Sequence, residues 1–217
     1  MAASLQLDVL VVPYKPIVAL IPPMGKGEAT WPATSEAQGQ LSPAYVLFWN
    51  TIFPGQIPEH PVVPDALDGD VIDLEGHELR SITVGQSDTT HSTIVHIPSL
   101  DAVISGDVAY NGIHQWLAQT DREKRMRWIA SVEQIEALKP RIVVAGHKRP
   151  DARDDDPAAI LTGTKVYIRD FEQSLSESHS AQELVDKMMA LHGALGNPYT
   201  LWTAAHGVFE QGQGATS

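Results

Sequence analysis

The chain has 217 residues, of which 15 are Lys or Arg and 27 are Asp or Glu, so its formal net charge is −12 at pH 7. Nucleic-acid phosphates are bound mainly by clustered basic residues, and this acidic balance leads us to expect no nucleic-acid partner. The sequence has no cysteine, which excludes disulfides, thiolate metal sites and thiol nucleophiles. With 43% hydrophobic and 19% charged residues, the composition is typical of a folded globular protein.

The first 40 residues differ in composition from the rest of the chain. Prolines and glycines between 13 and 40 disfavour long regular elements, and only the apolar run 7–12 has the character of a strand. The apolar stretches are shorter than the roughly 20 residues of a membrane-spanning helix and lack the basic start of a signal peptide. We expect an irregular segment at 1–40, a folded domain at 41–210, and a soluble, cytoplasmic protein with no membrane partner.

Four apolar stretches in the centre of the chain have the length and composition of strands. They cover residues 71–74, 78–84, 93–97 and 102–105. The segments between the first two and between the last two contain glycine, proline and aspartate, which are typical of tight turns. The sequence therefore predicts a meander of antiparallel strands.

After the meander the hydrophobic period becomes that of a helix. Thr120 and Glu123 form a capping box, and apolar residues recur at threefold spacing from Met126 to Leu138. An apolar strand at 141–146 follows, so we expect a strand–helix–strand unit from 102 to 146.

Two further helices are predicted to close the chain. One begins at Asp156-Pro157 and runs to about Leu175, and the other begins with the capping box of Ser180 and Glu183 and ends at Gly196. The predicted fold class is α/β. The large aromatic residues expected to anchor the core or an interface are Trp49, Phe53, Trp116 and Trp128.

Three predicted strands end in a glycine that is followed by a polar side chain. The polar residues after these glycines are Gln86, Asp107 and His147. Glycine allows a sharp turn or a close backbone approach, so these side chains can project from one edge of a sheet. Aspartate and neutral histidine are suitable ligands for a divalent ion such as zinc.

These three motifs, in this order, resemble the second half of the metallo-β-lactamase superfamily over roughly residues 42–205. The resemblance implies an αβ/βα sandwich fold and a metal-dependent hydrolase. It also implies that Asp107 and His147 are metal ligands and that the cofactor is zinc, iron or manganese.

Departures from the family pattern indicate a degenerate metal site in an N-terminally incomplete copy of the fold. The family's His-x-His-x-Asp-His loop is absent, and Pro13-Tyr14-Lys15-Pro16 stands where it is expected. Gln86 occupies the position of a third family histidine, and an amide oxygen is a much weaker zinc ligand than imidazole. A catalytic zinc site needs about three protein ligands, so the ligand set is incomplete and the metal can be absent.

The function implied by the resemblance is metal-dependent hydrolysis of a small ester, lactone or thioester, and whether catalysis survives stays open. The rival is a non-catalytic protein that binds a small molecule in the same cleft, or that associates through an uncovered sheet face with another subunit, including a second copy. Each candidate residue also has an ordinary role as an alternative, such as a turn cap for Asp107 or a solvated loop residue for His147. The further residues expected near the substrate are Gln86, Asp88, His114 and Lys148.

Overall fold

The computed structural model describes residues 46–47, 50–51, 54–56 and 69–214. The chain divides between Leu67 and Asp68 into two units, and the elements below belong to the second. The strand expected at 7–12 lies outside the described residues, and the domain boundary at residue 40 stays a prediction.

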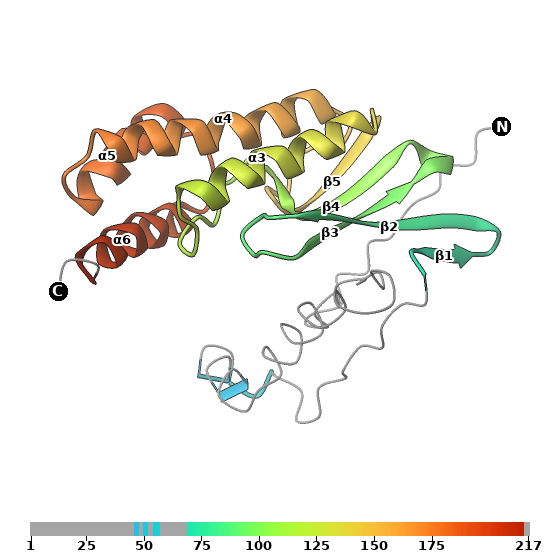
Figure 1. Ribbon diagram of the computed structural model, residues 1–217, viewed down its shortest axis with the longest axis horizontal. Coiled ribbons are helices and arrows are strands. Elements are labelled where there is room, and N and C mark those ends of the chain that lie inside the picture. The colour runs from blue at the N-terminus through green and yellow to red at the C-terminus, as the bar shows by residue number, and fades with distance from the viewer. Residues whose placement is uncertain (1–45, 48–49, 52–53, 57–68, 215–217) are drawn as a thin grey trace. The chain divides into compact units, whose positions relative to one another are not determined.

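A five-stranded sheet with the strand order β1-β2-β3-β4-β5 forms the centre of the second unit (Figure 1). Its first four strands are antiparallel neighbours, which confirms the predicted meander, and β5 runs parallel to β4, which confirms the strand–helix–strand unit. The strands are β1 (Val71–Leu74), β2 (His77–Gly85), β3 (Ser92–Ile97), β4 (Ala102–Asn111) and β5 (Ile142–Lys148).

Strand β4 continues well beyond Ser105, where the sequence predicted its end. Gly106 has a φ of +51°, and the pairing register with β5 shifts on both sides of it. A glycine in this conformation forms a bulge, after which the strand resumes instead of turning away. Asp107 therefore lies inside a strand and not at a strand end, so that prediction was wrong.

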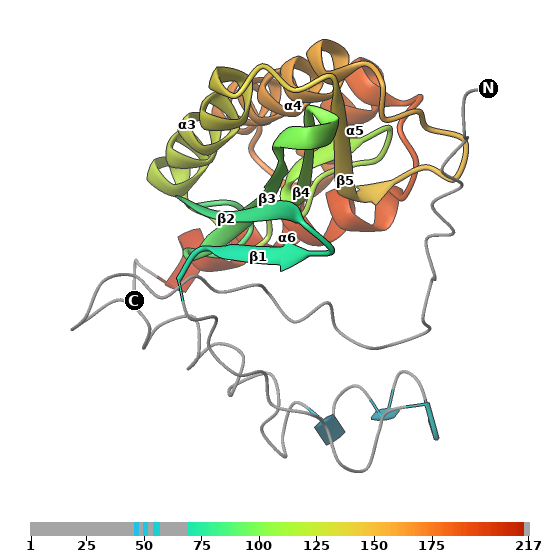
Figure 2. The ribbon, with the colours of Figure 1, turned by 90° about the vertical axis from the view of Figure 1, so that its right-hand side faces the viewer.

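Helices cover one face of the sheet, as Figures 1 and 2 show. Helices α3 and α4 contact β4 and each other, while α5 packs on α4 and α6 packs on α5. No helix among the described residues is long and apolar enough to cross a membrane. The helices are α3 (Arg122–Ala137), α4 (Pro157–Ser176), α5 (Ala181–His192) and α6 (Pro198–Gly214).

Helix α6 was not predicted. The sequence placed the end of the last helix at Gly196, whereas α5 ends at His192 and a new helix begins at Pro198. Proline fits the first turn of a helix, because the N–H that it lacks would have no partner there. The Gly-Asn-Pro sequence thus marks the start of α6, and α5 has already ended before it.

The first residues of the helices agree with the predicted caps in two of three cases. Asp156 caps α4 and Ser180 caps α5, each accepting a bond from a backbone N–H of the first turn. In α3 the cap is Asp121, which accepts a bond of 2.8 Å from the Lys124 N–H, and not Thr120. The Thr120 hydroxyl instead donates to the Leu117 carbonyl oxygen at 2.8 Å.

We expect Asp121→Ala to lower the free energy of unfolding by about 1 kcal/mol, because the first turn of α3 loses its cap. Chemical denaturation measures this change. Asp121→Asn keeps an acceptor oxygen and should cost much less. Equal losses in the two variants would contradict the assignment of the cap.

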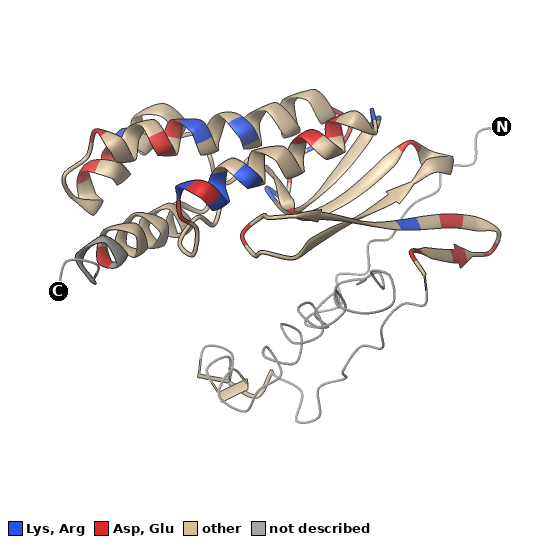
Figure 3. Cartoon of the chain, viewed as in Figure 1, with Lys and Arg blue, Asp and Glu red and all other residues tan. Residues whose placement is uncertain are grey.

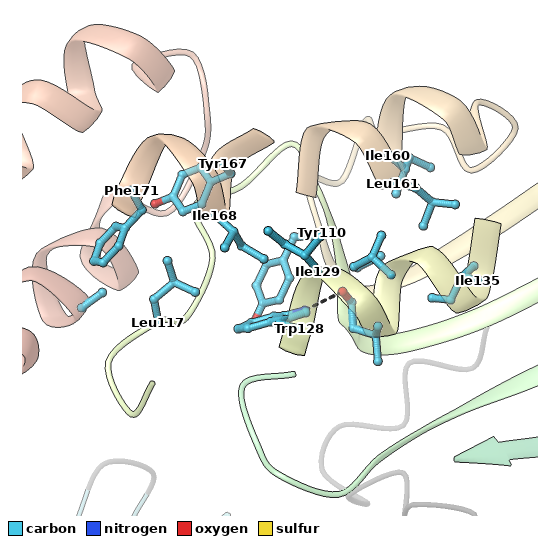
Figure 4. Packing of buried hydrophobic residues seen from close by; sticks show 14 of the residues in the cluster. Tyr110, Leu117, Trp128, Ile129, Ile135, Ile160, Leu161, Tyr167, Ile168 and Phe171 are labelled. Carbon is cyan, nitrogen blue, oxygen red and sulfur yellow. Dashed lines mark hydrogen bonds between the residues drawn. The ribbon is translucent and has the colours of Figure 1, made fainter. Parts of the chain in front are cut away.

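The hydrophobic core lies between the sheet and the helices (Figure 4). Trp128 is fully buried and its indole Nε1 donates to the Val108 carbonyl oxygen at 2.8 Å, which confirms Trp128 as a core anchor. The buried face of α3 differs from the predicted stripe, because Met126 is 39% exposed while the charged Arg125 is 3% exposed.

Candidate functional site

Asp107 and His147 face each other across the parallel strands β4 and β5. Asp107 Oδ1 and His147 Nε2 are 3.1 Å apart, and both side chains are about half exposed. Asp107 is the only Asp, Glu, Lys or Arg of β3 and β4, whose residues are all described. Figure 3 shows that these strands are mostly tan, the colour of residues other than Lys, Arg, Asp and Glu. The paired carboxylate and imidazole are therefore both within reach of solvent.

Gly146 allows β4 and β5 to approach closely at this pair. A Cβ added to Gly146 would lie 2.7 Å from Asp107 Oδ1 and 2.7 Å from the carbonyl carbon of Gly106. Real Cβ atoms do not make contacts this short. The atoms that a Cβ would meet belong to the backbone of Gly106 and to the carboxylate of Asp107, which is paired with His147, so neither can move aside easily. The glycine before His147 thus has the role expected from the sequence, a close backbone approach.

We expect Gly146→Ala to lower the free energy of unfolding by about 2 kcal/mol and to separate Asp107 from His147, because the backbone must shift. Chemical denaturation and the NMR signals of the His147 ring measure the two effects. Gly163→Ala in α4 is the matched control, since a Cβ there meets no atom within 4 Å. Gly163→Ala should be neutral or slightly stabilising, and a similar loss in both variants would contradict the close approach at Gly146.

Asp88 is electrostatically coupled to this pair. Burial, with the negative charge of Asp107 as the second cause, raises the pKa of Asp88 to about 6. The Ser87 hydroxyl and the Thr89 N–H bind Asp88 Oδ1 at 2.8 and 2.9 Å and oppose this shift. The hydrogen bond with Asp107 raises the pKa of His147 above its usual value. Two carboxyls and one imidazole therefore share a single electrostatic environment.

Gln86 is buried beside Asp88 and stabilises the turn that follows β2. Its Nε2 donates to the carbonyl oxygens of Ser87 and Thr89 at 2.8 and 3.0 Å. Its Oε1 has no hydrogen-bond partner in the described part of the chain. These bonds are those of a structural residue of the turn, and the place near the substrate expected of Gln86 stays a prediction.

Tyr110 is a site residue that the sequence did not reveal. It pairs in register with His147, and the two rings stack with centroids 5.3 Å apart and planes at 28°. The Tyr110 ring is buried, and burial raises the pKa of its hydroxyl, so the phenol is neutral. Because the strand was expected to end at Ser105, nothing in the sequence placed Tyr110 beside the imidazole.

His114 and Lys148 have other partners. His114 is fully buried, with Nδ1 at 3.0 Å from the Tyr167 hydroxyl, and its Nε2 has no hydrogen-bond partner among the described residues. Lys148 forms an ion pair with Asp154 at 2.5 Å. Contact of either residue with a substrate stays a prediction.

The buried His114 should make stability depend on pH. Burial, with a smaller effect of His192, lowers the pKa of His114 from 6.5 to about 4. Between these values the unfolded chain binds a proton that the folded protein does not, so the free energy of unfolding should fall as the pH falls from 6.5 to 4. The expected loss from this residue is about 3 kcal/mol.

Denaturation curves at several pH values between 7 and 4 measure this effect in the wild type and in His114→Gln. The variant lacks the titrating group, so its stability should fall less steeply with acidification. The contact of His192 Nε2 with Asp170 Oδ2, at 2.8 Å, does not involve the exchanged residue and is common to both proteins. Identical slopes in both proteins would show that His114 does not titrate as described.

The described residues do not complete a metal site. Within residues 69–214 and the short described segments before them, no group of three or more His, Asp or Glu side chains is placed to hold a metal ion. Asp107 and His147 supply two donors, whereas a catalytic zinc site takes about three protein ligands and a water. The donor set of the described residues does not, by itself, fit a catalytic metal ion.

Comparison with known proteins identifies the family. A family model described as the metallo-beta-lactamase superfamily matches residues 13–147 and so begins well before residue 42, where the motif resemblance started. A metallo-beta-lactamase family protein from Thermus thermophilus is 16% identical with a TM-score of 0.51, over 84% of this chain and 64% of that one. A beta-lactamase domain protein from Burkholderia ambifaria is 16% identical with a TM-score of 0.48, over 70% and 49%.

The chain spans less than two thirds of the length of both solved structures. No curated protein matches the sequence. The Thermus thermophilus structure supports the α/β fold, and the family model extends over more than half of the chain. The chain therefore belongs to the metallo-β-lactamase superfamily.

Proposed function

We propose that the chain is a hydrolase-like member of its superfamily whose metal site is degenerate. Metal-dependent hydrolysis of a small ester, lactone or thioester is then strongly reduced or lost. The observation that carries the proposal is the direct contact of Asp107 and His147 at 3.1 Å, while among the described residues no group of three or more His, Asp or Glu side chains is placed to hold a metal ion. Gln86, at the position of a family histidine, uses its amide N–H groups to bind backbone carbonyls.

Asp107, His147 and Tyr110 can bind a small molecule even without a complete set of metal ligands. Asp107 accepts a hydrogen bond from His147 and orients its imidazole, and Tyr110 stacks on the same ring. This arrangement can position a polar group of a small molecule at the sheet edge. A full family-type reaction would need ligands beyond those described.

Metal analysis of protein purified without chelator tests the proposal. We expect well below one zinc, iron or manganese ion per chain. Esters, lactones and thioesters should be hydrolysed slowly or not at all, and any hydrolysis gained on adding metal should vanish in Asp107→Ala and His147→Ala. His77→Ala, an exposed residue at the start of β2, is the control.

Two outcomes contradict the proposal. One or two tightly held ions per chain would show a complete site that draws ligands from elsewhere. Hydrolysis that survives both exchanges would place the reaction outside the Asp107–His147 pair.

The second candidate is a non-catalytic protein that associates through its sheet. The pairing register places Leu74, Val95 and Ile104 on one face, and Leu74 and Ile104 are 57% and 40% exposed. Exposed apolar side chains that share a face favour an interaction surface. The molar mass in solution tests for a second copy: a dimer that dissociates in Ile104→Lys supports this candidate, and a monomer at all concentrations excludes a stable homodimer.

A further inference from the structure

A hollow of about 260 Å³ lies beside α4, between that helix, the end of β4 and the segment after α5. Helix α4 contributes a stripe at helical spacing that includes Ala159, Ile160, Gly163 and Val166. The lining also includes Tyr110, the residue that stacks on His147. Most of the lining is therefore apolar.

The size of the hollow restricts what can occupy it. Pockets for drug-sized ligands have volumes of roughly 300–1,000 Å³, and this hollow lies just below that range. A peptide helix is about 10 Å wide and needs a longer and wider groove. The volume suits a single ring or a short branched chain.

The charged groups at the hollow are already paired. Arg153 forms an ion pair with Asp155, and His192 pairs with Asp170 at 2.8 Å. Asp156 uses its carboxylate to cap α4 through the Ala159 N–H at 3.0 Å. Because most of the lining is apolar, burying a charged ligand there would cost desolvation free energy, so an uncharged ligand is favoured.

One buried polar group of the lining has an unused acceptor. Gln115 is 2% exposed and donates from Nε2 to the Thr164 carbonyl oxygen at 3.0 Å. Its Oε1 has no hydrogen-bond partner among the residues that the structure describes, and this oxygen is itself buried. Because the oxygen is not exposed, a ligand in the hollow would contact the apolar lining instead.

Gly163 leaves the space open from the side of α4. A glycine inside a helix is unfavourable compared with alanine, and here no neighbour requires it, because an added Cβ would meet nothing within 4 Å. The absence of a side chain at this position contributes directly to the volume of the hollow.

From these observations we infer that the hollow beside α4 binds a small neutral molecule with an apolar, ring-sized body. This site is distinct from the Asp107–His147 pair and goes beyond the proposed function. It does not depend on whether that pair holds a metal ion.

Benzyl alcohol, with a ring and a single hydroxyl, is the probe. We expect saturable shifts of the amide NMR signals of α4 and of the Gln115 side chain, with a Kd in roughly the millimolar range for so few atoms. Gly163→Leu fills the hollow while improving helix propensity, so it should fold and bind the probe at least about tenfold more weakly. Gly163→Ala is the matched control and should bind within about twofold of the wild type.

The following results of the binding experiment would contradict the proposal. Shifts that do not saturate in the wild type, or equal binding by Gly163→Leu, would show that the hollow is not the binding site. Benzoate keeps the ring and carries a charge, so binding of benzoate as tight as that of benzyl alcohol would overturn the preference for a neutral ligand. Metal content and hydrolysis do not enter these measurements, so failure here leaves the proposed function untouched.

Discussion

Trp128→Ala is expected to lower the free energy of unfolding by about 4 kcal/mol, the largest effect of any single substitution considered. Trp128 is fully buried in α3 against the sheet, and Tyr110 lies with its ring centroid at 6.1 Å (Figure 4). Its removal leaves a cavity the size of an indole and frees the Val108 carbonyl oxygen, which accepts its N–H at 2.8 Å. Both losses destabilise the folded state.

Chemical denaturation by urea measures this change, with Trp128→Phe as the matched control. Phenylalanine keeps most of the buried ring and loses the hydrogen bond, so the loss should be smaller, at about 2 kcal/mol. A cost for Trp128→Ala below about 1 kcal/mol would contradict its place at the centre of the core.

Arg125→Met is expected to lower the free energy of unfolding by about 3 kcal/mol, because the substitution breaks a buried ion pair. The Arg125 side chain is 3% exposed, and its guanidinium binds Glu172 and the Thr120 carbonyl oxygen. The guanidinium also lies over the Phe171 ring, 5.3 Å from its centroid. Removing it leaves the Glu172 carboxylate, at 16% exposure, without its closest cation.

A double-variant cycle separates the pair from its surroundings. Arg125→Met with Glu172→Gln removes the unpaired charge and should recover at least about 1 kcal/mol. Arg127→Met is the surface control, since Arg127 pairs with Glu123 on the exposed side of α3 and should cost less than about 1 kcal/mol. Equal losses in Arg125→Met and Arg127→Met would contradict the burial of the first pair.

The candidate site was predicted in part. Asp107 and His147 do meet, because each follows a glycine within one of the two neighbouring parallel strands β4 and β5. Their roles as metal ligands, and the substrate contacts expected of Gln86, Asp88, His114 and Lys148, stay predictions. Tyr110 was missed because it depends on the strand that continues past Gly106.

The sequence by itself determined the meander, the strand–helix–strand unit and the starts of α4 and α5. These features follow from hydrophobic period, turn residues and caps, which act between residues close together in the chain. The family motifs are equally local, since each consists of a few adjacent residues.

Only the tertiary structure decided which polar groups lie inside and which residues meet. Arg125 is buried since Glu172 and Phe171 of α4 surround it, and no pattern within α3 contains that information. The continuation of β4 beyond Gly106 depends on its pairing with the neighbouring strand β5. The electrostatic effect of Asp107 on Asp88 depends on the pairing of β2 with β3, which brings the turn after β2 into place. Such contacts join residues distant in sequence, and their energy exists only once the core has formed.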